Sequence, residues 1–486
     1  MPDLAVSQQR QQAVQRPSVE TIAAALRNGT VTSEHLVENI FARIGDHDSR
    51  LGAFAALFKD SALAAAHEAD VATARGDDHG PLHGVPIAVK DIIATREGPT
   101  GAQSLVAAPG WPAERDATAV ARLRKAGAVV IGKTTTMEYA AGLPDIERPF
   151  PLPRNPWDPR RWTGGSSSGT AGGVAAGLVP AGLGTDTGGS IRWPSAWCGV
   201  TGLKPTYGRV PRSGVLPLGY TADHVGPIGL SARDCALLLQ SMAGPADDDP
   251  STADREVRTL LPEKGRDLSG LRVGVVRAGH LPTTADPGLA PTYAEAISVF
   301  EKLGASTVEV ELPLLSEMQV IDMVAVYAEA YSFHRNMLRT SWADYAPATR
   351  TMVALGGLIP AGDYLQAQRV RRVALRALAS LFSTVDLVIT PATAIPAVTY
   401  ADLTTGGAEW LGYLFSHLFT SYWDSAGYPV MAVPMGFSAD RLPLSLQIAG
   451  RPFAEDAVIG AGAAYQESTD WHLHLPPVAE EMDSLW

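Results

Sequence analysis

The feature that most constrains the fold of this chain is a segment of small residues at 164–202, in which glycine, serine, threonine and alanine predominate. A flexible linker would have a similar composition. This segment also carries large apolar side chains such as Val174, Ile191 and Trp197, which are rare in linkers. Small residues placed between apolar ones favour a backbone that packs closely, with amide groups free to face a ligand. We therefore expect a packed segment of a folded domain.

Short apolar runs alternate with amphipathic patterns along the rest of the chain. The run 86–89 predicts a buried strand, 116–126 predicts a helix, and 128–131 predicts another strand, which ends at Gly132. Further strands are expected at 271–276, 307–312, 386–390, 430–434 and 444–448. This alternation favours an α/β fold with helices on both faces of a sheet.

The patterns indicate one large domain over residues 1–486, with a polar tail at 1–17. Ser18 and Ser33 are expected to cap the first two helices, because serine hydroxyls accept from the free N–H groups of a first turn. A helical insertion is expected near 315–380, where strand patterns are missing.

Composition excludes several classes of protein. The formal net charge is −12 and no Lys/Arg run is longer than 369–372, which argues against nucleic-acid binding. Two cysteines, Cys198 and Cys235, are too few for a disulfide framework or a Cys-rich zinc site. The N-terminus has no signal-peptide core, and no window reaches about 18 uninterrupted apolar residues, so we expect no membrane span. The expected location is the reduced cytoplasm.

Three side chains are candidates for chemistry: Lys90 after its apolar strand, Ser166, and Ser190 after a glycine pair. Burial at the end of a strand would lower the pKa of Lys90 and make it a general base. Alternatively, Lys90 reaches the surface or pairs with Asp91, and position alone does not decide between these interpretations.

Two other motifs in the sequence offer alternative sites. Residues 165–169 fit the G-x-S-x-G nucleophile elbow, but that motif needs a hydrophobic strand before it, whereas 155–163 is Pro-rich, charged and loop-like. His472 and His474 could form a metal pair, but a surface tail is the simpler interpretation. No metal or other cofactor is expected, and no phosphate-binding glycine motif is present.

Several segments together resemble the amidase signature family, and the similarity extends from about residue 18 to 467. The segments are GVPIAVKD (84–91), GKTTTMEYA (132–140), NPWDPRR (155–161), GGSSSGTA (164–171), GTDTGGSIRWPSAWCGVTGLKPTYGRV (184–210), VGPIG (225–229), GYPVMAVPMGF (427–437) and LPLSLQIAG (442–450). The resemblance implies a mixed central β-sheet flanked by helices on both faces, with a signature core at 84–245.

The resemblance also implies a role for each candidate. Ser190 would be the nucleophile, Ser166 a bridging serine that follows a cis peptide bond, and Lys90 the base. The turn formed by Thr187, Gly188, Gly189 and Ser190 would supply backbone N–H groups to an oxyanion. Supporting roles are expected for Ser167, which could hydrogen-bond the Ser166 hydroxyl, and for Asp186 and Arg192, which would fasten the loop.

The family cleaves C–N bonds in amides, and some members cleave carbamates or ureas. Aromatic residues in 323–337 and 410–423 favour a hydrophobic or N-aryl amide or carbamate, as in aryl-acylamidase or urethanase members, although they could equally fill a helical core. Substrate-binding candidates are Tyr139, Tyr331 and Trp423.

Two other functions stay open. One is the glutamine-hydrolysing subunit of a tRNA-dependent amidotransferase, from which the sequence departs at 220–224 and at Asp424, a position usually held by Asn. The other is a non-catalytic binding protein. The expected partner is a small-molecule amide or carbamate, and the expected state is a monomer or homodimer.

Overall fold

The computed structural model describes residues 16–108, 111, 115–482 and 485. Its centre is one 11-stranded sheet in the order β1-β3-β2-β6-β8-β7-β12-β13-β11-β9-β10. The strands are β1 (Phe54–Leu57), β2 (Pro86–Lys90), β3 (Val129–Thr134), β6 (Ala181–Asp186), β7 (Thr201–Lys204), β8 (His224–Gly229), β9 (Arg272–Val276), β10 (Ser306–Val310), β11 (Leu387–Pro391), β12 (Val430–Phe437) and β13 (Pro443–Gly450).

The sheet mixes parallel and antiparallel pairs. β2 lies parallel to β3 and β6, and β9 lies parallel to β10 and β11. Antiparallel pairs join β6 to β8, β7 to β8 and to β12, and β13 to β11 and β12. Every residue of β2, β6 and β13 is buried, as expected for strands covered on both faces. The chain is thus a single α/β domain, which confirms the predicted fold class.

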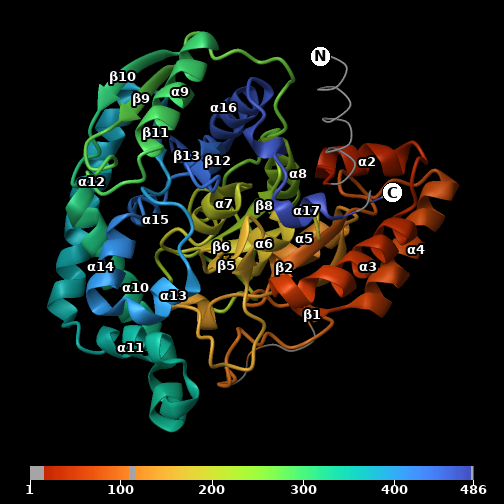
Figure 1. Cartoon of the computed structure of the whole chain (residues 1–486), viewed down its shortest axis with the longest axis horizontal. Coiled ribbons are helices and arrows are strands. Elements are labelled where there is room, and N and C mark those ends of the chain that lie inside the picture. The colour runs from red at the N-terminus through yellow and green to blue at the C-terminus, as the bar shows by residue number, and fades with distance from the viewer. Residues whose placement is uncertain (1–15, 109–110, 112–114, 483–484, 486) are drawn as a thin grey trace.

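Helices cover the sheet. The helices are α2 (Val19–Arg27), α3 (Ser33–Leu51), α4 (Lys59–Arg75), α5 (Thr118–Lys125), α6 (Ser168–Ala175), α7 (Arg192–Cys198), α8 (Ala232–Met242), α9 (Leu289–Lys302), α10 (Leu315–Ser341), α11 (Pro347–Gly356), α12 (Ala361–Thr384), α13 (Tyr400–Thr405), α14 (Gly407–Ser416), α15 (Ser421–Ala426), α16 (Glu455–Glu467) and α17 (Pro477–Glu480). The long helices α10 and α12 lie on the left of Figure 1, and the N-terminal helices α2, α3 and α4 lie on the right.

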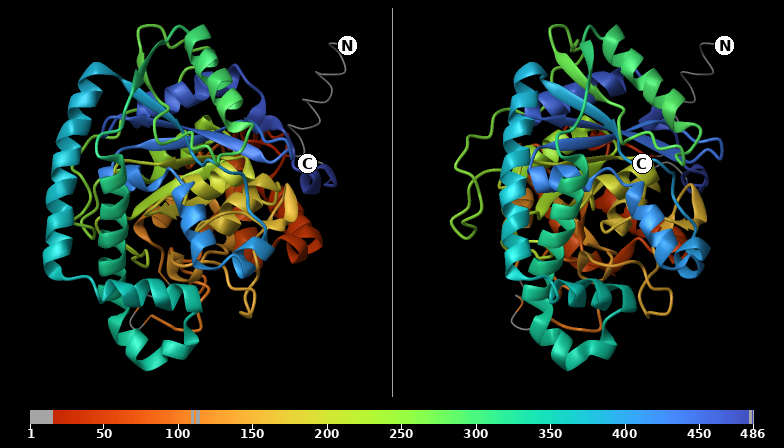
Figure 2. Two further views of the ribbon diagram at one scale, coloured as in Figure 1. Left: turned by 60° about the vertical axis from the view of Figure 1, so that its left-hand side comes forward. Right: turned by 90° about the vertical axis from the view of Figure 1, so that its left-hand side faces the viewer.

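Three helices, α10, α11 and α12, occupy most of residues 315–384, the region where an insertion was expected. The helices α10 and α12 run side by side in both views of Figure 2 and contact each other. Ile321 of α10 and Leu378 of α12 belong to one apolar cluster with Trp423 of α15. This packing holds α10 against α15, and both helices lie near the glycine-rich turn described below.

The N-terminal part of the chain differs from expectation in two places. Ser18 caps α2 as predicted, but α3 is capped by Thr32, whose side chain accepts from His35 N. Ser33 instead donates from Oγ to Gly84 O at 2.7 Å. Residues 1–15 of the predicted tail 1–17 lie outside the described residues. Arg16 is buried and donates a hydrogen bond to Ala175 O at 3.0 Å.

Two element boundaries were also predicted wrongly. The strand expected to stop at Gly132 continues to Thr134. Glycine has no side chain, so β1 can approach β3 closely here, whereas a Cβ on Gly132 would collide with the Ala56 carbonyl oxygen. Residues expected to form a loop before the glycine-rich segment instead form a two-stranded ribbon, β4 (Arg154–Asn155) and β5 (Asp158–Trp162). Among the described residues, no helix is both long and apolar enough to cross a membrane.

Candidate active site

Lys90 is the last residue of β2 and is fully buried. Its ammonium nitrogen donates to Ser166 Oγ at 2.7 Å and to Thr185 Oγ1 at 2.8 Å. It does not pair with Asp91, which forms an ion pair with Lys133 at 3.3 Å. Burial lowers the pKa of Lys90 to about 7, while nearby carboxylates partly oppose this shift. A lysine in this state can lose its proton near neutral pH and then accept one from a hydroxyl.

Ser166 follows a cis peptide bond, Gly165–Ser166, as expected. The side chain of Ser167 lies elsewhere than predicted, because its Oγ donates to Thr185 O and accepts from Thr185 N, both at 3.2 Å. It therefore does not support the Ser166 hydroxyl directly. Ser167 is also fully buried, whereas a nucleophile elbow exposes its serine to the substrate, so the geometry opposes the elbow interpretation.

Ser190 lies in the turn between β6 and α7 and is half-buried. Its carbonyl accepts from Ser167 N at 3.1 Å, so the two serine-bearing segments are neighbours. Within the described part of the chain, the hydroxyls of Ser166 and Ser190 are not hydrogen-bonded to each other. The structure thus joins Lys90 directly to Ser166, and joins Ser190 to that segment through the backbone.

The turn before Ser190 supplies backbone donors, with one correction. In the described part of the chain, the N–H groups of Thr187, Gly188 and Ser190 have no protein acceptor. The N–H of Gly189 instead donates to Asp186 Oδ1 at 2.6 Å, so the prediction that it is a free oxyanion donor is wrong in this structure. A Cβ at Gly189 would collide with Thr420, and its φ of 124° suits glycine.

Asp186 and Arg192 form a buried ion pair that holds this turn, and we call this pair together with Asp424 the clasp. Asp186 Oδ2 accepts from Arg192 Nε at 2.9 Å and from Ile191 N at 3.1 Å. Arg192 also contacts Asp424 Oδ2 at 2.6 Å, and all three side chains are fully buried. Burial raises the pKa of Asp424 well above its usual range. Arg192 holds the pKa of Asp186 well below its usual range despite burial. This geometry matches the fastening role expected for the pair.

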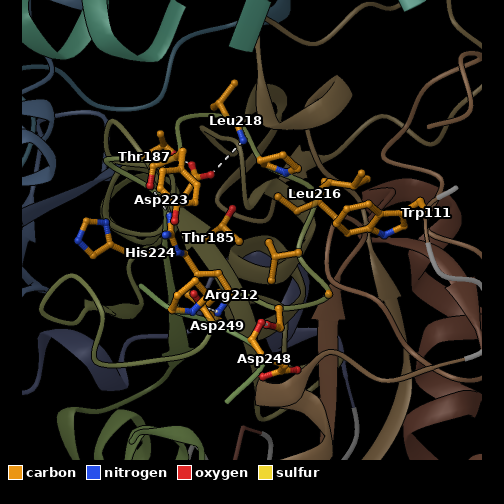
Figure 3. Close-up of a pocket in the computed structure, with 18 of the residues that line it drawn as sticks. Trp111, Thr185, Thr187, Arg212, Leu216, Leu218, Asp223, His224, Asp248 and Asp249 are labelled. Carbon is orange, nitrogen blue, oxygen red and sulfur yellow. Dashed lines mark hydrogen bonds between the residues drawn. The ribbon is translucent and has the colours of Figure 1, made fainter. Parts of the chain in front are cut away.

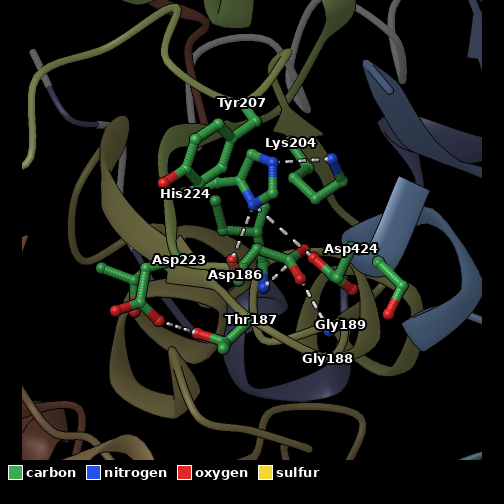
Figure 4. Close-up of polar contacts among 12 residues, drawn as sticks. Asp186, Thr187, Gly188, Gly189, Lys204, Tyr207, Asp223, His224 and Asp424 are labelled. Atoms are coloured by element: carbon green, nitrogen blue, oxygen red, sulfur yellow. Dashed lines mark hydrogen bonds and ion pairs between the residues drawn. The ribbon is translucent and has the colours of Figure 1, made fainter. Parts of the chain in front are cut away.

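A lysine–histidine pair that the sequence reasoning missed lies beside the clasp (Figure 4). Lys204 Nζ donates to Tyr428 O at 2.6 Å, to Pro205 O at 3.3 Å and to His224 Nε2 at 3.2 Å. Because Nε2 accepts, the ring proton lies on Nδ1, which faces Asp186 O at 3.2 Å. Thr185, which contacts Lys90, was also missed, although it stands in the same GTDTGGS run as Ser190.

The clasp makes a stability prediction. Arg192→Met removes the cation between two buried carboxylates, so it should lower the free energy of unfolding by about 3–5 kcal/mol. Urea unfolding followed by circular dichroism would measure this loss. The matched control is Arg160→Met, since Arg160 is 84% exposed although it also pairs with an aspartate, Asp158, at 2.9 Å. Its change should stay within about 1 kcal/mol, and equal losses in both variants would contradict the clasp.

A cavity of about 440 Å³ adjoins the site on the side of Thr185 and Thr187. Trp111 lies on one side of it, and Thr187 and Asp223 lie on the opposite side (Figure 3). Thr187 Oγ1 donates to Asp223 Oδ1 at 2.7 Å. The apolar part of the lining consists mainly of Ile92, Trp111, Val215, Leu216, Leu218 and Val225. The cavity is large enough for a small ring-bearing molecule.

None of the three predicted substrate-binding residues lines this cavity. Trp423 is fully buried in the apolar cluster between α10, α12 and α15, so it fills a core. Tyr331 packs beside Gly357 after α11, and Tyr139 is buried with its hydroxyl donating to Val106 O. The sequence of a helical segment does not reveal which of its aromatic side chains pack into the protein core and which line a cavity. Across the described residues, no group of three or more His, Cys, Asp or Glu is placed to hold a metal ion.

Known proteins resemble this chain along most of its length. The profile of the family described as Amidase matches residues 35–459. An "Amidase" of Pseudomonas putida is 39% identical over 469 residues, covering 95% of this chain and 98% of the relative. One subunit of the glutamyl-tRNA(Gln) amidotransferase of Chloroflexus aurantiacus is 36% identical, covering 94% and 98%. The native peptide amidase of Stenotrophomonas maltophilia superposes with a TM-score of 0.82 at 30% identity, covering 95% and 98%.

Proposed function

This chain belongs to the amidase signature family and hydrolyses amides, and on that premise we propose that it uses Ser190, Ser166 and Lys90 to cleave hydrophobic or N-aryl amides. The observation that carries the proposal is the 2.7 Å contact between Lys90 Nζ and Ser166 Oγ in a fully buried setting. A neutral lysine there can accept a proton from either of two hydroxyls, Ser166 and Thr185, and of these Ser166 lies in the segment that also contacts Ser190. Half-buried Ser190 is joined to the same segment by the hydrogen bond from Ser167 N to its carbonyl.

The proposed reaction runs through an acyl-enzyme. Neutral Lys90 takes the proton of Ser166, Ser166 takes the proton of Ser190, and Ser190 Oγ attacks the substrate carbonyl carbon. The free N–H groups of Thr187, Gly188 and Ser190 stabilise the negative charge on the carbonyl oxygen. The relay then runs backwards and protonates the departing nitrogen, without which the C–N bond does not break. Water hydrolyses the ester at Ser190 by the same proton path.

The cavity beside Thr187 supports an aryl substrate. Its apolar walls can bury a ring, and each Å² of apolar surface removed from water contributes roughly 25 cal/mol. A carbamate presents the same carbonyl and the same nitrogen to the relay, so small N-aryl carbamates are proposed as further substrates. We propose a monomer or homodimer acting in the cytoplasm on small molecules, with no nucleic acid or membrane partner.

A second candidate is glutamine hydrolysis within an amidotransferase, which the 36% identity to the amidotransferase relative favours. In that case the purified chain should hydrolyse glutamine only when a further subunit is present. A free-standing amidase should instead hydrolyse acyl anilides alone and act weakly on glutamine. A panel of anilides, aliphatic amides, N-aryl carbamates and glutamine separates the two functions.

Tyr220 offers a direct test of the aryl pocket. It lines the cavity, is 56% exposed, and stacks on Arg212 at 4.8 Å, so its removal should leave the fold intact. Tyr220→Ala should raise KM for acyl anilides about fivefold to tenfold and leave KM for acetamide unchanged. Trp342→Ala, an exposed aromatic that does not line the cavity, is the control. Equal effects of Tyr220→Ala on both substrates would remove the aryl pocket from this place.

A further inference from the structure

Asp322 on α10 is a buried carboxyl group that faces the turn before Ser190. Asp322 is only 6% exposed, and its Oδ1 accepts a hydrogen bond from Ser425 Oγ at 3.0 Å. Its Oδ2 lies opposite Gly188, because a Cβ placed on Gly188 would be 3.4 Å from that oxygen. Gly188 is the exposed residue of the turn, so the turn reaches the surface at this residue.

Among the described residues, none forms an ion pair with Asp322. Of the two nearby cations, Arg192 is paired with Asp186 and Asp424. The other is Arg371 of α12, whose guanidinium donates to the carbonyls of Ser425, at 2.6 Å, and Thr221, at 3.2 Å.

The titratable neighbours of Asp322 do not all act in one direction. The Asp186 carboxylate raises the pKa of Asp322, whereas the guanidinium groups of Arg371 and Arg192 lower it. Asp424 on α15 and Tyr327 on α10 have pKa values that are themselves raised, by burial and in part by the Asp322 carboxylate. Burial, together with the Asp186 carboxylate, raises the pKa of Asp322 to about 8. At neutral pH the side chain is therefore mainly a neutral acid with one O–H group.

The position of that proton follows from the contacts. Since Oδ1 accepts from Ser425, the O–H group lies on Oδ2, for which the described residues offer no acceptor. An ionised Asp322 would repel the negative charge that develops on the substrate oxygen, whereas a neutral one can share it. One backbone donor of the turn, the N–H of Gly189, is already held by Asp186. A further donor facing Gly188 compensates for it.

We propose that Asp322 is an additional substrate-binding residue, which donates a hydrogen bond from Oδ2 to a substrate oxygen lying against Gly188. This inference rests on the proposed function, since it assumes that the carbonyl reacts at Ser190. The oxygen is either the carbonyl oxygen or the second oxygen of a carbamate, and both are acceptors of the same kind. Asp322 takes part as a donor only, so no bond forms or breaks at its side chain.

Two variants test the donor. Asp322→Asn keeps an N–H donor of the same shape, so kcat/KM for an acyl anilide at pH 7 should stay within about threefold of the wild type. Asp322→Leu removes the donor and should lower kcat/KM roughly 100-fold for the substrate whose oxygen this donor contacts. Wild-type kcat/KM should fall as the pH rises above about 8, where Asp322 ionises, and Asp322→Asn should lack this fall. Thermal unfolding of both variants controls for the fold.

Comparing substrates identifies the oxygen. If the partner is the carbonyl oxygen, Asp322→Leu should slow an anilide and an N-aryl carbamate equally. If it is the second carbamate oxygen, only the carbamate should be slowed. No loss with Asp322→Leu on either substrate would overturn the proposal, as would an alkaline fall that persists unchanged in Asp322→Asn.

A measurement without turnover keeps this inference separate from the proposed function. The infrared spectrum of the wild type at pH 7, minus that of Asp322→Asn, should contain the carbonyl stretch of one protonated carboxyl group, which disappears at high pH. If that band is missing from the difference spectrum at pH 7, Asp322 is ionised and the inference fails whatever the substrate. A wild-type enzyme that is inactive on the whole substrate panel would instead contradict the proposed function.

Discussion

Replacing Ser190 with alanine is expected to lower kcat/KM for any amide substrate by roughly 10⁴-fold or more. The loss follows because Ser190 is the nucleophile of the proposed relay through Ser166 and Lys90, and without a nucleophile the acyl-enzyme does not form. Steady-state kinetics on an acyl anilide would measure it. The fold should be unaffected, since the change removes one half-buried oxygen.

The matched control is Ser168→Ala in the neighbouring loop. The Ser168 hydroxyl donates to Gly164 O at 2.7 Å and has no place in the proposed relay. This variant should retain activity within about tenfold of the wild type. A Ser190→Ala enzyme with activity comparable to that of Ser168→Ala would show that the nucleophile lies elsewhere.

Replacing Lys90 with arginine is expected to reduce kcat/KM by roughly 10³-fold or more, because a guanidinium group stays protonated and does not accept the Ser166 proton. In the wild type, the base must be neutral. Since burial lowers the pKa of Lys90 to about 7, kcat/KM should rise with pH through that value and fall about tenfold per pH unit below it. A pH profile from 5 to 8 would reveal this limb.

Lys133 provides a control on the neighbouring strand. It is also buried, but it pairs with Asp91 at 3.3 Å and contacts neither catalytic serine. Lys133→Arg can keep that ion pair, so the rate and the acidic limb should stay close to those of the wild type. If Lys90→Arg is as active as Lys133→Arg, lysine has no role as a base.

Much of the fold could be predicted because its strands are local apolar runs. The run at 86–89 marks β2, and the later runs mark β9 to β13 within one or a few residues. Boundaries that depend on distant contacts were missed. The choice between Thr32 and Ser33 as a cap depends on the Gly84 carbonyl, 51 residues away, which takes the Ser33 hydroxyl.

The candidate site divides in the same way. Lys90, Ser166 and Ser190 stand in recognisable local motifs, and the structure brings Lys90 and Ser166 into contact. The hydrogen bond from the Gly189 N–H to Asp186 depends on the orientation of the Asp186 carboxylate, which the spacing of residues in the sequence does not specify. The position of Asp322 depends on α10 packing against α15, more than 100 residues from the turn it faces.

Covalent labelling tests the central claim most directly. The enzyme would be treated with a serine-directed phosphonate, digested and sequenced by mass spectrometry. We predict a single modified serine, Ser190, with labelling that slows below pH 7 as Lys90 becomes protonated and is lost in Ser190→Ala. Modification of Ser167 instead, or labelling that persists in Ser190→Ala, would contradict the proposed Ser190–Ser166–Lys90 mechanism.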